Sequence, residues 1–178
     1  MEPRAADLVR RFQDGDESAS ELLFRRSTPT TLGLIYAFVG RVQDAEDLVQ
    51  EVFLEAQKSI AHLRNPASFS SWLYKITQRV CNRWLREQQR APKGLESPED
   101  IVDAAESAAD DEQLRIRATV DGMAQPLREV IYLRYFHAAS YEQMGTTLGI
   151  SASAVNARLM KARKILKIRL EQIARSRA

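Results

Sequence analysis

Cysteine and histidine are scarce in this chain. Its 178 residues include one cysteine, Cys81, and two histidines, His62 and His137, which lie far apart in the sequence. A single cysteine cannot form an intramolecular disulfide, and these three residues lack the spacing of a zinc site. Cys81 is therefore predicted to serve packing, and neither a metal ion nor another cofactor is expected.

Long apolar runs and the usual catalytic motifs are missing as well. No apolar run approaches the ~20 residues that a membrane-spanning helix requires, and the first residues do not follow the order of a secretion signal. There is no glycine-rich phosphate loop and no serine in a nucleophile elbow. These absences predict a cytoplasmic protein without membrane insertion, which is not an enzyme and has no small-molecule substrate.

Helical periodicity, by contrast, runs through most of the sequence. Apolar residues recur at intervals of three and four, and no alternating strand pattern occurs, so the fold is predicted to be all-α. The periodicity fades between residues 91 and 111, where Pro92 and Pro98 interrupt it. We predict two small helical domains joined by a flexible linker: residues 1–92, the linker 93–112, and residues 113–178.

Charge is distributed unequally among these three parts. Residues 1–92 hold 13 basic and 12 acidic side chains, residues 93–112 hold 1 and 8, and residues 113–178 hold 12 and 4. A basic C-terminal domain favours a polyanionic partner such as nucleic acid. Extended, the linker of about 20 residues would reach at most ~70 Å, which is roughly two turns of duplex DNA. Two tethered units could therefore read one stretch of DNA.

The C-terminal part carries the signals of a helix-turn-helix. Ser140 and Gln143 have the spacing of a capping box, which predicts a short helix ending at Gly149. Ser151 can cap a second helix two residues later. A capped helix, a tight turn and a second capped helix form the motif that places a recognition helix in the major groove of DNA.

The second helix has an apolar side and a polar side. Val155, Leu159 and Ala162 lie on the side predicted to be buried, together with Leu166 and Leu170. The other side is small and polar at its start and basic further on, which suits contacts to base edges and then to phosphates. The alternative is a solvated basic helix packed on its neighbour. The candidate DNA contacts are Ser151, Ser153, Ala154, Asn156, Ala157, Arg158, Lys161, Arg163 and Lys164.

A long helix is predicted in the N-terminal part, from Phe69 to about Gln89, with Ser68 as its cap. Its buried stripe should comprise Phe69, Leu73, Ile76, Val80 and Trp84. A second sector is basic, with Trp72 at its edge, and contains Lys75, Arg79, Arg83, Arg86 and Arg90. Trp72 either stacks on an unpaired base beside this cationic face or packs as an ordinary core residue.

The preceding helix is predicted over residues 43–59. One of its faces carries Asp44, Asp47, Glu51 and Glu55, which have no basic partner at i+4 along the helix before Lys58. We interpret these acids as nearly unopposed, and they are either simply solvated or suited to a basic protein surface. Leu54 lies among them, off the core sector, and is predicted to be exposed.

Four blocks of the sequence resemble the signature blocks of extracytoplasmic-function sigma factors. They are residues 14–17 (Asp-Gly-Asp-Glu), 44–53 (Asp-Ala-Glu-Asp-Leu-Val-Gln-Glu-Val-Phe), 71–76 (Ser-Trp-Leu-Tyr-Lys-Ile) and 148–151 (Leu-Gly-Ile-Ser). In that family the second block binds the clamp helices of the largest subunit of RNA polymerase. The resemblance thus implies core RNA polymerase as a partner of Asp44, Asp47, Leu48, Gln50, Glu51, Leu54 and Glu55.

The same resemblance implies promoter DNA as the second partner. The loop at residues 63–70 and the helix after it would bind the −10 element and trap a flipped base, through Asn65, Ser68, Phe69, Trp72, Lys75, Arg79, Arg83 and Arg86. The helix-turn-helix would read the −35 element, and an anti-sigma factor is expected to hold the protein inactive. The chain departs from the family where Arg79 and Arg83 replace common Asn and Asp residues, and where Ala154 and Asn156 replace a common Thr and a basic residue.

Two other classes of function remain open at the level of sequence. A helix-turn-helix regulator would bind operator DNA without polymerase and use its N-terminal domain for dimerisation or sensing. A helical adaptor would use its acidic and basic faces only to bind proteins, and it would show no salt-dependent affinity for DNA. The sigma-factor hypothesis differs from both because it predicts specific initiation when core polymerase is added.

Overall fold

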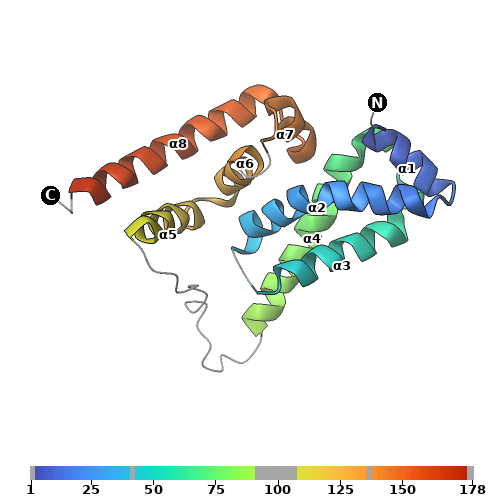
Figure 1. Ribbon diagram of the computed structural model, residues 1–178, viewed down its shortest axis with the longest axis horizontal. Coiled ribbons are helices and arrows are strands. Elements are labelled where there is room, and N and C mark those ends of the chain that lie inside the picture. The colour runs from blue at the N-terminus through green and yellow to red at the C-terminus, as the bar shows by residue number, and fades with distance from the viewer. Residues whose placement is uncertain (1–2, 41–42, 91–107, 136–137, 176–178) are drawn as a thin grey trace.

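The computed structural model describes residues 3–40, 43–90, 108–135 and 138–175, and over these ranges the secondary structure is helical, with no strand (Figure 1). The all-α prediction is therefore confirmed. The N-terminal lobe, residues 3–90, contains α1 (Ala5–Gln13), α2 (Glu17–Val39), α3 (Ala45–Ser59), the short 3-10 helices η1 (Ile60–His62) and η2 (Pro66–Ser68), and α4 (Phe69–Arg90). The C-terminal lobe, residues 108–175, contains α5 (Ala108–Asp121), α6 (Gln125–Tyr135), α7 (Tyr141–Leu148) and α8 (Ala152–Arg175).

Only the last part of the predicted linker, residues 93–112, lies within the described residues. Residues 93–107 lie outside the described residues, whereas residues 108–112 form the start of α5. The acidic residues Asp110, Asp111 and Glu112, at the end of the predicted linker, thus belong to the first turns of this helix. Acidic side chains are favourable at that end of a helix, where the backbone N–H groups point outward. None of the described helices is both long and apolar enough to cross a bilayer.

The acidic block at residues 14–17 builds the corner between α1 and α2. Asp16 caps α2, because its Oδ1 accepts hydrogen bonds from the Ser18 hydroxyl at 2.6 Å and from the Ala19 backbone N–H at 3.2 Å. Arg11 of α1 pairs with Asp16 Oδ2 at 2.6 Å. The Ser18 hydroxyl and then Arg11 lower the pKa of Asp16 to about 2. Gly15 turns the chain with a φ of +92°, a conformation that favours glycine.

The core of the N-terminal lobe forms where α2, α3 and α4 pack together. Phe69, Leu73, Ile76 and Val80 of the predicted α4 stripe are buried, whereas Trp84 is partly exposed. Cys81 is a free thiol in this core, and burial raises its pKa to about 12. Its predicted role in packing is confirmed.

The helix-turn-helix forms as its local signals predicted. Ser140 and Gln143 make both hydrogen bonds of a capping box at the start of α7. Gly149 ends α7 in the left-handed conformation with a φ of +68°, and the Ser151 hydroxyl accepts a hydrogen bond from the Ala154 N–H at 3.2 Å. Val155, Leu159 and Ala162 of α8 are fully buried. The apolar side of the recognition helix is thus confirmed over these three positions.

The two lobes pack against each other and share core residues. Leu34 and Ala37 of α2 are buried in the same apolar cluster as Val130 and Leu133 of α6. Helix α6 packs against α2, and α7 packs against the first half of α4; Figure 1 shows the C-terminal lobe beside these helices of the N-terminal lobe. The lobes of the free chain therefore form one continuous body, an arrangement that the sequence did not predict.

Candidate nucleic-acid interface

The polar side of α8 faces solvent. Ser153, Asn156, Ala157, Lys161 and Lys164 are exposed, and Ala154 is partly exposed. Ser151 is exposed too, but its hydroxyl contacts Ser153 and caps the helix. The side chain of Met160 is also exposed, at 62%. The start of the helix therefore presents small polar groups, and the lysines follow one turn later.

Two of the predicted cations on α8 contact other helices of the C-terminal lobe. Arg158 is only 31% exposed, and its Nη1 lies 3.8 Å from Oε2 of Glu129 on α6. Arg163 donates from Nε to the Tyr135 hydroxyl at 3.0 Å. Both arginines therefore hold α8 against α6 in the free chain, and Lys161 and Lys164 are exposed cations of the recognition helix.

The loop before α4 has an ordered polar structure. Asn65 is exposed, but its Oδ1 accepts a hydrogen bond from the Ala67 N–H at 3.1 Å and thereby caps η2. The Ser68 hydroxyl donates to the Asn65 carbonyl at 2.7 Å. Phe69 is 3% exposed and belongs to the core, so it is wrongly predicted as a surface contact for a base. The buried stripe of α4 begins at this residue, which is why the ring points inward.

Trp72 lies at the edge of the core of the N-terminal lobe. It is partly exposed, and its ring centroid lies 5.9 Å from that of Phe69. Part of the ring therefore packs, as the core alternative predicted, and part remains at the surface beside the exposed Lys75. Arg86, further along α4, is also exposed.

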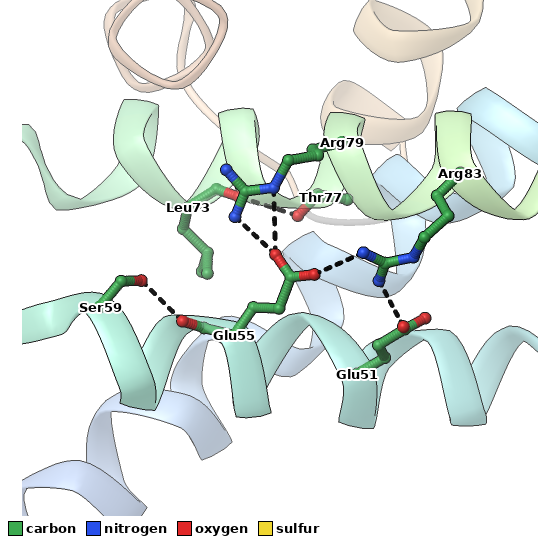
Figure 2. Close-up of polar contacts among 7 residues, drawn as sticks. All are labelled: Glu51, Glu55, Ser59, Leu73, Thr77, Arg79 and Arg83. Atoms are coloured by element: carbon green, nitrogen blue, oxygen red, sulfur yellow. Dashed lines mark hydrogen bonds and ion pairs between the residues drawn. The ribbon is translucent and has the colours of Figure 1, made fainter.

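An ion-pair cluster joins α3 to α4. Figure 2 shows Arg79 and Arg83 of α4 converging on Glu55 of α3. Arg79 donates from Nε and Nη2 to Oε2 of Glu55 at 3.1 and 2.5 Å, and Arg83 donates from Nη1 to Oε1 at 2.8 Å. Arg83 also pairs with Glu51. We define the ion-pair cluster as Glu51, Glu55, Arg79 and Arg83.

The cluster corrects two predictions. The acids of α3 are not nearly unopposed, because Glu51 and Glu55 pair with arginines that lie 24 to 32 residues away in the sequence. In turn, Arg79 and Arg83 are not simply part of a free cationic face for DNA, because each donates hydrogen bonds to a carboxylate. Periodicity along one helix could not reveal either fact, since the partners belong to different helices.

Glu55 and Arg83 should show a measurable energetic coupling. Burial raises the pKa of Glu55, but the hydrogen bonds from Arg79 and Arg83 outweigh it, so its pKa lies below the ordinary value. A double-mutant cycle with Glu55→Ala and Arg83→Ala, measured by denaturant unfolding at neutral pH, should give a coupling of about 0.5–1 kcal/mol, since solvent screens this partly exposed pair. The exposed pair Asp7–Arg10 is the control, and its coupling should be near zero.

The same coupling should depend on pH. A carboxylate whose pKa is lowered by folding adds stability that is complete above its ordinary pKa and is lost as the pH falls through the folded value. The Glu55–Arg83 coupling should therefore be constant from neutral pH down to about the ordinary value of 4.5 and should decline below it. A coupling that grows on acidification would contradict the ion-pair assignment.

The exposed face of α3 presents acids around one large apolar side chain. Asp44, Asp47 and Gln50 are exposed, and Leu54 is 54% exposed, as predicted. Leu48 is 3% exposed and lies in the core, so its prediction as a surface contact is wrong. It occupies the apolar stripe of α3 together with Val52. We define the α3 surface as Asp44, Asp47, Gln50 and Leu54.

Comparison with known proteins shows which family has this arrangement. Residues 23–91 match the family described as Sigma-70 region 2, and residues 113–166 match Sigma-70, region 4. The chain belongs to the sigma-70 family. It is of the extracytoplasmic-function type, as the names of its relatives indicate. Region 2 therefore spans most of α2 through α4, and region 4 includes the helix-turn-helix.

The relatives match almost the whole chain. The RNA polymerase sigma-H factor of Pseudomonas aeruginosa is 28% identical over 94% of this chain and 94% of its own length. The ECF RNA polymerase sigma-E factor of Escherichia coli strain K12 is 27% identical over 94% of this chain and 95% of its own. Among solved structures, CnrH in complex with the cytosolic domain of CnrY shares the fold with a TM-score of 0.68, covering 94% of this chain and 97% of that one at 23% identity.

Proposed function

We propose that this sigma-70 family protein is an alternative sigma factor that binds core RNA polymerase and directs initiation at specific promoters. It acts without catalysing a reaction, through binding alone, and we place it in the cytoplasm with the polymerase. The observation that carries the proposal is a capped helix-turn-helix with an exposed polar and basic face, in one chain with a region 2 whose α3 surface exposes Leu54 among acids. The relatives give no support to a polymerase-independent regulator.

Each surface has a proposed partner. The α3 surface binds the polymerase, where Leu54 provides an apolar contact and Asp44 and Asp47 provide charge complementarity. We propose that Lys75 and Arg86 of α4 track the DNA backbone while Trp72 stacks on an unpaired base of the −10 element. Such stacking is worth about 1–3 kcal/mol per base, which offsets the few kcal/mol lost when a base leaves the duplex.

The −35 element is assigned to α8. Its first two turns offer Ser153 and Asn156 to base edges, and Asn can donate to and accept from an adenine edge in the major groove. Lys161 and Lys164 lie further along the helix and neutralise phosphates. Arg158 and Arg163 contribute indirectly, because they fix α8 on α6. We retain the proposed domain division at residues 1–92 and 113–178 for these two functions.

An anti-sigma protein is the third proposed partner. The expectation comes from the family resemblance, and it agrees with the solved complex of CnrH, a chain of the same fold, with the cytosolic domain of CnrY. Such an inhibitor would compete with core polymerase for this chain.

In vitro transcription with purified core polymerase and a promoter library tests the proposal directly. We expect transcripts only when this protein and core enzyme are both present, starting downstream of a shared pair of sequence elements. Protein that never associates with core enzyme and yet occupies specific DNA sites alone would refute the proposal.

Lys161 should act as a phosphate contact without base preference. Lys161→Ala should weaken binding to duplexes that contain the −35 element by a similar factor for every sequence, and it should reduce the slope of log K against log salt by about 0.9. Lys167→Ala is the matched control, because Lys167 is exposed on the same helix but pairs with Glu171 at 3.9 Å. A loss of affinity confined to one base of the element would contradict the phosphate assignment.

A further inference from the structure

The polar side of α8 carries one large sulfur-containing side chain. Met160 is 62% exposed, whereas Leu159 and Ala162 beside it in the sequence are fully buried. At about 100° per residue, Met160 lies about 40° around the helix from Asn156 and about 40° from Lys164 on the other side. Met160 therefore lies in the middle of the face assigned to the −35 element, between a candidate base contact and a candidate phosphate contact.

The sulfur of Met160 contacts the side chain that is proposed to read a base. Asn156 donates a hydrogen bond from Nδ2 to Met160 Sδ at 3.8 Å. A thioether sulfur is a weak acceptor, so this contact leaves the Asn156 amide able to turn to a base edge. The apolar Met160 side chain can itself contact the methyl group of a thymine in the major groove. The reduced form of Met160 is thus compatible with DNA binding.

The other methionines in the described part of the chain are buried. Met144 is 0% exposed and Met123 is 6% exposed, and both belong to the core of the C-terminal lobe. Oxidation of a side-chain sulfur depends on its exposure to the oxidant, so Met160 should react first. Cys81 is buried as well, and its raised pKa of about 12 keeps it in the slowly reacting thiol form at neutral pH.

From these observations we propose that Met160 is an oxidation site at which a peroxide switches off recognition of the −35 element. Hydrogen peroxide transfers one oxygen atom to Met160 Sδ: the O–O bond breaks, a sulfur–oxygen bond forms, the thioether is oxidised by two electrons and the peroxide is reduced to water. The product is methionine sulfoxide, which methionine sulfoxide reductases convert back to methionine. The site is therefore reversible.

The added oxygen changes two contacts of the recognition helix. It is a stronger acceptor than the thioether sulfur and is bonded to the atom that Asn156 already contacts, so it should hold the Asn156 amide on its own helix. It also makes the Met160 side chain polar, and a polar group that loses water against a thymine methyl without gaining a partner weakens binding. The site itself follows from the structure of the chain, and only the effect on DNA rests on the proposed function.

Graded treatment of the full chain with hydrogen peroxide at neutral pH, followed by peptide mass mapping, tests the site. We expect Met160 to gain one oxygen atom at doses that leave Met123 and Met144 unmodified. Because the Met160 side chain is exposed, the melting temperature of this protein should match that of the untreated protein. Oxidation of Met123 or Met144 as early as Met160 in the folded protein would overturn the assignment.

Binding to DNA tests the switch at the dose that modifies Met160 alone. Affinity for the duplex that the untreated protein selects from the promoter library should fall about tenfold, and sulfoxide reductases should restore it. Met160→Leu, a substitution of similar volume without sulfur, is the matched control, and the ratio of its affinities before and after the same treatment should stay near one. Met160→Gln places a polar side chain at this position and should bind weakly without any peroxide.

Two results would refute the switch. One is full affinity in protein whose Met160 is oxidised, and the other is an equal loss of affinity in treated Met160→Leu, which would assign the effect to another residue. Untreated protein that binds no duplex, with or without core polymerase, would count against the proposed function alone. The order of oxidation in the mass map would still decide whether Met160 is the reactive site.

Discussion

Leu54→Glu should reduce affinity for core RNA polymerase by about 100-fold or more and abolish promoter-specific transcription. Leu54 is the large apolar side chain of the α3 surface and is 54% exposed. Few residues carry most of the binding energy of an interface, and a buried charge without a partner is among the most costly changes at such a position. Because the side chain is exposed in the free protein, the melting temperature should change little.

Asp47 provides a controlled comparison on the same surface. Asp47→Lys should weaken polymerase binding about tenfold, whereas Glu46→Lys should have little effect. Both residues are exposed, and they are adjacent, so they point about 100° apart around α3. Glu51 is less suitable for charge reversal, because it pairs with Arg83 and its loss would disturb the ion-pair cluster. Equal effects of Asp47→Lys and Glu46→Lys, measured by binding to core enzyme, would refute the proposed surface.

Gly145→Ala should destabilise the C-terminal lobe by about 1–3 kcal/mol and weaken binding to the −35 element. In the interior of a helix, alanine is ordinarily preferred to glycine by about 1 kcal/mol. Here, however, a Cβ at Gly145 would lie 2.7 Å from the Ile150 carbonyl oxygen, closer than real Cβ contacts. The Ile150 N–H in turn donates to the Gly145 carbonyl at 3.0 Å, so the turn between α7 and α8 cannot move away without losing that hydrogen bond.

Gly122 is the control for this substitution. A Cβ there would meet the Ala118 carbonyl oxygen at 3.4 Å, close to ordinary contact, so Gly122→Ala should be nearly neutral. Thermal unfolding and binding to a duplex with the −35 element check both variants. A stabilised Gly145→Ala protein with unchanged DNA binding would show that the turn is looser than its backbone geometry indicates.

Features that depend on neighbours in the sequence could be predicted. The capping box at Ser140, the left-handed Gly149 and the cap at Ser151 are all confirmed, because each involves residues within about one turn of one another. The wrong predictions arose where a residue was assigned a surface contact without regard to the face of the helix on which it lies. Leu48 and Phe69 resemble family contacts in position, but both lie on apolar stripes and are buried.

The amino-acid sequence by itself determined the helices, their apolar and polar faces and the turn of the helix-turn-helix, since helical periodicity and capping act over a few residues. Only the tertiary structure decided that Arg79 and Arg83 pair with Glu55, and that Glu129 binds Tyr74 across 55 residues of sequence. A periodic pattern specifies which side of a helix is buried or charged. It carries no information on which distant helix supplies the opposing side chains, and here those partners determine which charges remain available to polymerase and DNA.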